Sequence, residues 1–237
     1  MQTDGQAIQE HLETVEAERS RRSVDLVLAG RVHAVKSFQH ARFQSTYADL
    51  LADSRYARAA RFFLDDLYGP HDFTERDAQF ARIVPALVRL FPREIVATVR
   101  ALAELHALTE VLDSAMAGQV KHTELSFEDY QAAWRATGHR DDRFRQIALM
   151  LRIGRALQAY TANPLVRHTL RMMRRPAHLA GLGALQSFLE TGFETFRSMR
   201  GSEAFLQTIA DRETELAERL FGPANPPVEE NGGQIRR

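Results

Sequence analysis

The sequence predicts an all-α fold, in the form of a single bundle-like domain of about seven to nine helices. Apolar residues recur at spacings of three and four along most of the chain, and the period-two alternation typical of strands is nearly missing. Proline, glycine and capping residues divide the 237 residues into segments of helical length. We expect this domain to cover residues 1–221. Residues 222–237 hold three prolines and three glycines among few apolar groups, so we expect a disordered tail.

The first segment, about residues 6–52, is expected to be helical with a bend at Gly30. Its early part, residues 6–25, carries only a narrow apolar stripe among many charged residues. The stripe consists of Ile8, Leu12 and Val15. Because isolated helices of this length are marginal in water, we predict that residues 6–25 protrude and dock on a second copy, giving a homodimer. The alternative is a frayed helix lying across its own domain.

The same signals predict the later helices. In chain order we expect helices over about 54–68, 75–91, 93–117, 127–136, 141–161, 164–175, 177–200 and 202–221. Pro85 should kink the second of these, and Pro176 should separate the sixth from the seventh. Ser126 and Asn163 are expected to cap helix starts, and Gly138 to close a helix end. The segment 177–200 is the most apolar, so we expect it to be the central helix.

Residues 61–77, RFFLDDLYGPHDFTERD, predict a corner between two helices. Gly69 can take a positive φ just past a helix end, and Pro70 then prevents continuation. Thr74 is expected to be the N-cap of the next helix, with acidic residues in its first turn.

This run resembles an uncharacterised family of bacterial all-helical proteins with an F-F-L-x-x-L-Y-G-x-x-D-F-x-x-R-D signature, matched by residues 62–77. The resemblance supports the fold and implies no established activity. On the matching positions it points to Tyr68, Asp72, Arg76 and Asp77 as candidate binding residues. The alternative is that these four side chains cap helices and hydrogen-bond within the corner.

The composition restricts the function classes. The formal net charge is zero, which argues against a general polyanion binder, and cysteine is absent, which removes thiolate chemistry and disulfides. The polar N-terminus and the lack of a long apolar run favour a cytoplasmic protein that does not associate with a membrane. There are 29 arginines and only two lysines, Lys36 and Lys121. This bias is typical of a GC-rich coding background, so single arginines are weak functional clues.

His106, Glu110 and Asp113 are the best candidates for metal ligands. Their spacings of four and three place them on one side of a helix, where a second helix could complete a site. The alternative is a solvated or semi-exposed polar face with an ordinary His–Glu pair. Residues His168 and His178, which flank Met172 and Met173, raise the idea of a haem pocket over an apolar floor. That floor would consist of Phe188, Leu189 and Phe193. We predict no cofactor.

Charge is segregated along the second half of the chain. Residues 140–175 carry nine arginines against two acidic residues, whereas residues 190–230 are acidic. Arg171 and Arg174 are therefore candidate anion-binding residues. The alternative is that the basic and acidic regions neutralise each other, and we do not expect specific nucleic-acid binding. Three glycines, Gly181, Gly183 and Gly192, indicate close helix packing or room for an apolar ligand.

No signature of a known enzyme class is present, so whether the chain catalyses a reaction stays open. We predict a non-catalytic interaction or regulatory protein, which forms a homodimer or binds another protein. The alternative is a protein or enzyme that binds a small molecule, metal or haem in an interhelical pocket near residues 61–77.

Overall fold

The computed structural model describes residues 3–67 and 73–222, and these residues form helices and no strand. The all-α prediction is confirmed, but the described residues contain eleven α-helices and one π-helical segment, η1, which is more than predicted. The elements are α1 (Asp4–Val24), α2 (Leu26–Thr46), α3 (Ala48–Ala52), α4 (Ala57–Arg61), η1 (Phe62–Leu67), α5 (Thr74–Leu90), α6 (Arg93–Gln119), α7 (Phe127–Thr137), α8 (Arg140–Thr161), α9 (Pro164–Leu179), α10 (Gly183–Ser198) and α11 (Glu203–Phe221). The additional helices arise because the first predicted segment is divided into three.

The first division falls at Asp25, so the predicted bend at Gly30 is wrong. The Asp25 side chain accepts a hydrogen bond from the backbone N–H of Leu28 at 2.9 Å and thereby caps α2. Gly30 lies inside α2. The predicted caps farther along are confirmed, because Ser126 and Asn163 accept hydrogen bonds from the first turns of α7 and α9 and Gly138 takes a φ of 72°.

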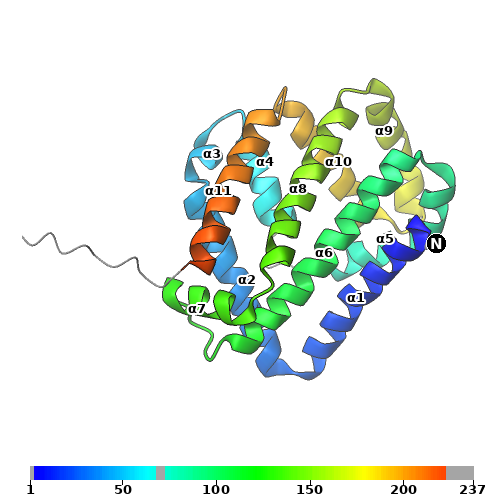
Figure 1. Cartoon of the computed structure of the whole chain (residues 1–237). Helices are drawn as coiled ribbons and strands as arrows, with labels where there is room; N and C mark the ends of the chain where they lie inside the picture. Colours follow the sequence, from blue (N-terminus) through cyan, green and yellow to red (C-terminus); the bar gives the residue numbers. More distant parts are fainter. Residues whose placement is uncertain (1–2, 68–72, 223–237) are drawn as a thin grey trace, which may run out of the picture.

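The central helix is α6, not the predicted segment 177–200. The described apolar core forms three clusters, and α6 contributes buried residues to each of them. Figure 1 shows α6 running through the middle of the molecule with α1 alongside it. Alanines occupy several sides of α6, which lets neighbouring helices approach it closely all round. The buried alanines of α6 are Ala101, Ala103, Ala107 and Ala117.

The segment 177–200 is divided, and the position of the division differs from the prediction. Helix α9 continues through Pro176 to Leu179, and α10 begins at Gly183. Gly181 has a φ of 68°, and the N–H of Leu182 donates to the carbonyl of Ala177 at 2.8 Å, which closes α9 in a Schellman arrangement. The close-packing prediction for Gly192 is confirmed, since a Cβ there would lie 3.0 Å from the ring of Phe62.

The apolar stripe of helix α1 is buried within its own chain. The stated reason for a protruding segment 6–25, that this stripe needs a second copy to cover it, is therefore wrong. Ile8 and Val15 are 0% and 2% exposed, and Leu12 is also buried. Ile8 and Leu12 pack in one apolar cluster with residues of α5 and α6, including Val84. Contact with α5 and α6 thus lets a largely polar helix pack on the domain. The structure thus corresponds to the alternative of a helix lying across its own domain.

Part of the predicted corner lies outside the described residues, including Tyr68, Gly69, Pro70 and Asp72. Of the rest, Thr74 is the first residue of α5 rather than its N-cap, and Glu75 and Asp77 occupy the first turn as predicted. Pro85 lies inside α5. The predicted tail from residue 223 onward is also outside the described part of the chain. Within that part, no helix combines the length and apolar character needed to cross a bilayer.

Candidate functional site

One face of α6 carries a row of polar side chains toward the inside of the molecule. His106, Glu110 and Asp113 project from this face, as their spacing predicts. Glu110 is 4% and Asp113 1% exposed, so the expectation of a solvated or semi-exposed face is wrong for these two carboxyl groups. Buried carboxyl groups require partners, and α1 and α2 supply them, while α5 contributes a partner for His106. We call His106, Glu110, Asp113, Arg19, Arg22, Lys36 and Asp77 the α6 ionic cluster.

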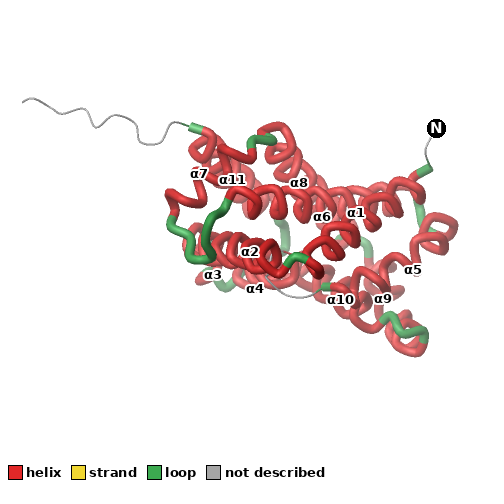
Figure 2. The backbone as a smooth tube through the Cα atoms, turned by 90° about the horizontal axis from the view of Figure 1, so that it is seen from below, coloured by secondary structure: helices red, strands yellow, loops and turns green. Residues whose placement is uncertain are grey.

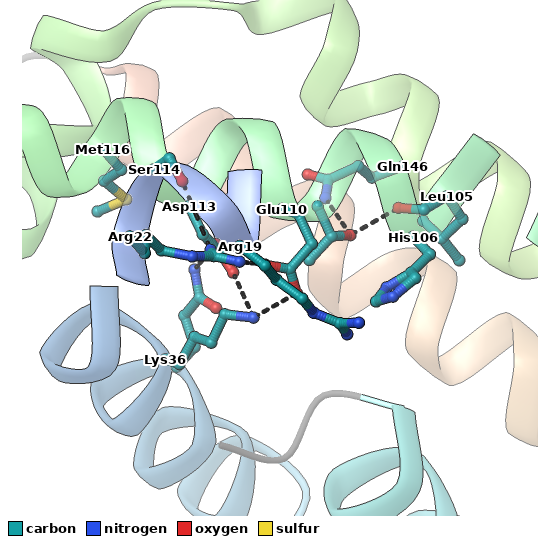
Figure 3. Close-up of polar contacts among 12 residues, drawn as sticks. Arg19, Arg22, Lys36, Leu105, His106, Glu110, Asp113, Ser114, Met116 and Gln146 are labelled. Carbon is teal, nitrogen blue, oxygen red and sulfur yellow. Dashed lines mark hydrogen bonds and ion pairs between the residues drawn. The ribbon is translucent and has the colours of Figure 1, made fainter. Parts of the chain in front are cut away.

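Glu110 lies between two cations. Lys36 Nζ of α2 donates to Glu110 Oε1 at 2.6 Å, and Arg22 of α1 donates to Glu110 Oε2. Figure 3 shows the two cationic side chains reaching Glu110 from different helices. Burial alone would raise the pKa of Glu110, but Lys36 and Arg22 outweigh this effect and lower it to about 2. Glu110 is therefore a fixed negative charge that joins α1, α2 and α6.

Asp113, one turn farther along α6, is more completely enclosed. Its Oδ1 accepts a hydrogen bond from Gln39 at 3.1 Å, and its Oδ2 lies 3.8 Å from Lys36 Nζ. Burial raises the pKa of Asp113; Lys36 opposes this effect and Glu110 adds to it. Asp113 is thus a weaker counter-charge for Lys36 than Glu110 is.

Asp77 connects the candidate binding residues of the 61–77 motif with the candidate metal ligands of α6. It belongs to the 61–77 motif, and its Oδ2 lies 2.8 Å from Nε2 of His106, one of the proposed metal ligands. The same oxygen accepts a hydrogen bond from Arg19 of α1 at 2.6 Å, and Oδ1 accepts one from Arg76 at 3.1 Å. Burial alone would raise the pKa of Asp77, but these partners hold it well below its ordinary value. Asp77 therefore links α1, α5 and α6.

The cluster is arranged as ion pairs. Its carboxylates are directed toward Arg19, Arg22 and Lys36, and in residues 3–67 and 73–222 no group of three His, Asp or Glu side chains could hold a metal ion. The residues suggested for a haem pocket do not lie together around one apolar pocket. Met172 and Met173 are exposed on α9, while Phe188 stacks on Phe62 in the core at 5.6 Å between ring centres.

A pocket of about 210 Å³ opens beside the cluster. It is lined by Arg19, Arg22, Ala29, Val32, His33, Lys36, Phe73 and Glu110. Arg19 and Arg22 are three residues apart on α1, which places both guanidinium groups on the same side of that helix. Phe73 directly precedes α5, so the pocket adjoins the described end of the 61–77 motif. A second, larger pocket of about 510 Å³ lies nearby along α2 and is mainly apolar.

The predicted anion-binding arginines of α9 lie elsewhere. Arg174 pairs with Glu190 of α10 at 2.5 Å, and Arg171 lies 3.6 Å from Glu194. These contacts support the alternative in which the basic and acidic segments neutralise each other. Figure 2 shows α9 beside α10 at the end of the molecule opposite α7.

The outer face of α9 is apolar and exposed. Leu165, Met172 and Leu179 are separated by seven residues, about two helical turns, so they lie along one side of the helix. They are 72%, 64% and 91% exposed. Arg171 and Arg175 flank this stripe, and the only α9 residue that is fully buried is Ala177. We call Leu165, Met172 and Leu179 the α9 stripe.

Sequence reasoning missed the cationic half of the α6 ionic cluster. Arg19 and Arg22 belong to the charged residues of segment 6–25, whose charges the sequence predicts to pair with a second copy of the chain. Lys36 carried a usable signal, because it is one of two lysines in a chain with 29 arginines, and the other, Lys121, is exposed. The pairing itself depends on contacts across 58 to 88 residues of sequence, which no local pattern reveals.

These features define an all-helical protein whose long central helix carries a buried ionic cluster. Residues 18–227 match the family model described as Domain of unknown function (DUF8198), and the chain belongs to this family. The matched range includes every member of the α6 ionic cluster and all of α9. No curated protein matches the chain. No solved structure matches it either.

Proposed function

We propose that this protein is an interaction protein that binds a partner protein through the α9 stripe. The observation that carries the proposal is the exposure of Leu165, Met172 and Leu179 along one side of a single helix. Isolated exposed apolar residues are common, whereas an aligned row of them is typical of a docking surface. The mode that fits is the packing of one amphipathic helix against another.

The charges beside the stripe favour a partner with an acidic flank. Arg171 and Arg175 lie on the same side of the stripe, and Arg175 forms no ion pair within the described part of the chain. Two copies of α9 packed antiparallel about a two-fold axis would bring this basic flank against itself, which is unfavourable. An amphipathic helix with carboxylates along one flank would bury the stripe and pair these arginines. The apolar stripe of α1 that was predicted to form a homodimer is already buried within the chain. The partner favoured here is therefore a different protein.

A photocrosslinking amino acid at Met172 of the full chain, expressed in the native host, tests the proposal. We expect a discrete adduct with a second protein, weakened by Leu179→Glu and by the double change Arg171→Glu with Arg175→Glu. The matched control carries the crosslinker at Gln207, an exposed residue of α11, and should give no such adduct.

Other products would contradict the proposal in identifiable ways. An adduct of twice the mass of the chain would show that the stripe binds a second copy. Lipid adducts, together with sedimentation on anionic vesicles, would show a membrane-facing helix. The absence of any adduct at position 172 would remove the proposal altogether.

A second candidate function follows from the pocket beside Phe73. The sequence left open a small-molecule-binding protein with an interhelical pocket near residues 61–77. The described pocket between α1, α2 and α6 adjoins this region and is lined by charged side chains, which is an observation in favour of ligand binding.

A further inference from the structure

The pocket beside the α6 ionic cluster has an excess of positive charge. Three cations line it, Arg19, Arg22 and Lys36, against one carboxylate, Glu110. The other two carboxyl groups of the cluster, Asp77 and Asp113, do not line the pocket. The lining of the pocket therefore carries three cations and one carboxylate, while Asp77 and Asp113 balance Arg19 and Lys36 from outside the lining.

We propose that this pocket binds a small organic anion, whose phosphate or carboxylate group is held by Arg19, Arg22 and Lys36. The inference rests on the second candidate function and is independent of docking through α9. It names the ligand chemistry of the pocket, which neither the family description nor the sequence assigns.

The cations retain donors for a ligand. A guanidinium group has five N–H donors and an ammonium group three. Among the described residues, Arg19 donates to Asp77, and Arg22 donates to Glu110 and Ser114. Lys36 donates to Glu110 at 2.6 Å and lies 3.8 Å from Asp113. Most N–H groups of Arg19 thus remain available at the pocket. The guanidinium fork of Arg19 matches the geometry of a phosphate or carboxylate. Arg22, whose terminal nitrogens already donate to Ser114 and Glu110, adds positive charge beside it.

The low exposure of these side chains strengthens their attraction for an anion. The side chains of Arg19, Arg22 and Lys36 are 18%, 11% and 21% exposed, so water screens their charges less than it screens surface arginines.

The remaining walls limit the organic part of the ligand. Ala29, Val32 and Phe73 provide the apolar part of the lining. The volume of about 210 Å³ is below the range of roughly 300–1,000 Å³ for drug-sized ligands. A phosphate monoester of a small alcohol or a short-chain carboxylate fits this space.

Isothermal titration calorimetry on the full chain tests the inference. The probes are inorganic phosphate, glycerol 3-phosphate and succinate, each at ionic strength matched with sodium chloride. We expect saturable one-site binding of at least one probe, with a Kd below about 1 mM. Preference for the two phosphates over succinate would assign a phosphate site, and the reverse preference would assign a carboxylate site.

Matched variants localise the binding. Lys36→Gln and Arg22→Gln should each weaken it at least tenfold, whereas Lys121→Gln and Arg21→Gln, which change exposed residues of the same types, should leave it unchanged. Ala29→Phe fills the pocket without removing a charge and should also abolish binding, which separates loss of the site from loss of the ion pairs.

Two results would overturn the inference. One is the absence of saturable binding by the wild-type protein for all three probes. The other is binding that persists in the Lys36→Gln, Arg22→Gln and Ala29→Phe proteins, since the anion would then bind elsewhere. Neither result bears on α9, because the Leu179→Glu change used to test docking does not touch the pocket.

Discussion

Around α6, charged side chains are buried and paired, whereas on α9 apolar side chains are exposed and have no cover. In the α6 ionic cluster the cost of removing charges from water is offset by short ion pairs between helices distant in sequence. On α9 the ion pairs lie at the surface, and the apolar stripe contributes nothing to the chain's own core. The difference indicates that α6 contributes to the stability of the fold through buried ion pairs, whereas the α9 stripe adds little to it.

The largest expected effect is that of Glu110→Gln. This change leaves the buried cations Arg22 and Lys36 without their carboxylate, which should cost about 3–5 kcal/mol in the free energy of unfolding. Urea denaturation followed by circular dichroism measures this quantity.

Glu190→Gln is the matched control on α10. Its ion pair with Arg174 is largely at the surface, so the loss should be below about 1 kcal/mol. Equal losses for the two variants would show that the buried and the surface ion pairs contribute equally to the free energy of unfolding.

The pH dependence of the free energy of unfolding should report on the carboxylate of Glu110. The pKa of Glu110 is lowered to about 2 in the folded protein, so its stabilisation is present above the unfolded value near 4.5 and is lost as the pH falls toward 2. The loss should be on the order of 3 kcal/mol.

The comparison of the wild-type protein with Glu110→Gln over this range removes contributions from groups that Glu110 does not affect. The stability difference between the two proteins should shrink as the pH falls from about 4.5 to about 2. Asp113 acts in the opposite direction, since a carboxyl group with a raised pKa stabilises the fold when protonated. Because Glu110 helps to raise that pKa, this contribution is smaller in the variant. A constant difference across the range would contradict the assigned role of Glu110.

A smaller effect is expected for Ile8→Val on α1. Ile8 is fully buried within the chain, so loss of one methylene should cost about 0.5–1.5 kcal/mol. Light scattering should show no change in oligomeric state. A change in oligomeric state without a loss of stability would instead support docking of residues 6–25 on a second copy.

The smallest effect on stability is expected for Leu179→Ser on α9. Leu179 is 91% exposed, so the free energy of unfolding should change by less than about 0.5 kcal/mol. Thermal unfolding measures this, and Leu206→Ser, at a buried position of α11, is a destabilising reference. A large loss for Leu179→Ser would mean that the stripe packs within the chain.

Part of the candidate site could be predicted from local pattern. The helical spacing of His106, Glu110 and Asp113 placed them on one face of α6, and the 61–77 motif identified Arg76 and Asp77. The pattern did not show how deeply these side chains are buried, because spacing indicates which residues share a helix face but not what packs against that face. Arg19, Arg22 and Lys36 cover it, and they come from helices that the sequence assigned to a protruding segment and an ordinary packing helix.

The sequence by itself determined the helical class and most helix ends, since periodicity and capping act between residues a few positions apart. Ser126, Gly138 and Asn163 show this, because each acts on the adjoining helix. Only the tertiary structure decided that α6 is central, that α1 lies on it, that Asp77 meets His106, and that the α9 stripe stays uncovered. These outcomes depend on which helix faces fit together across long stretches of chain. The free energy of that fit comes from packing and desolvation, which belong to pairs of helices rather than to any one segment.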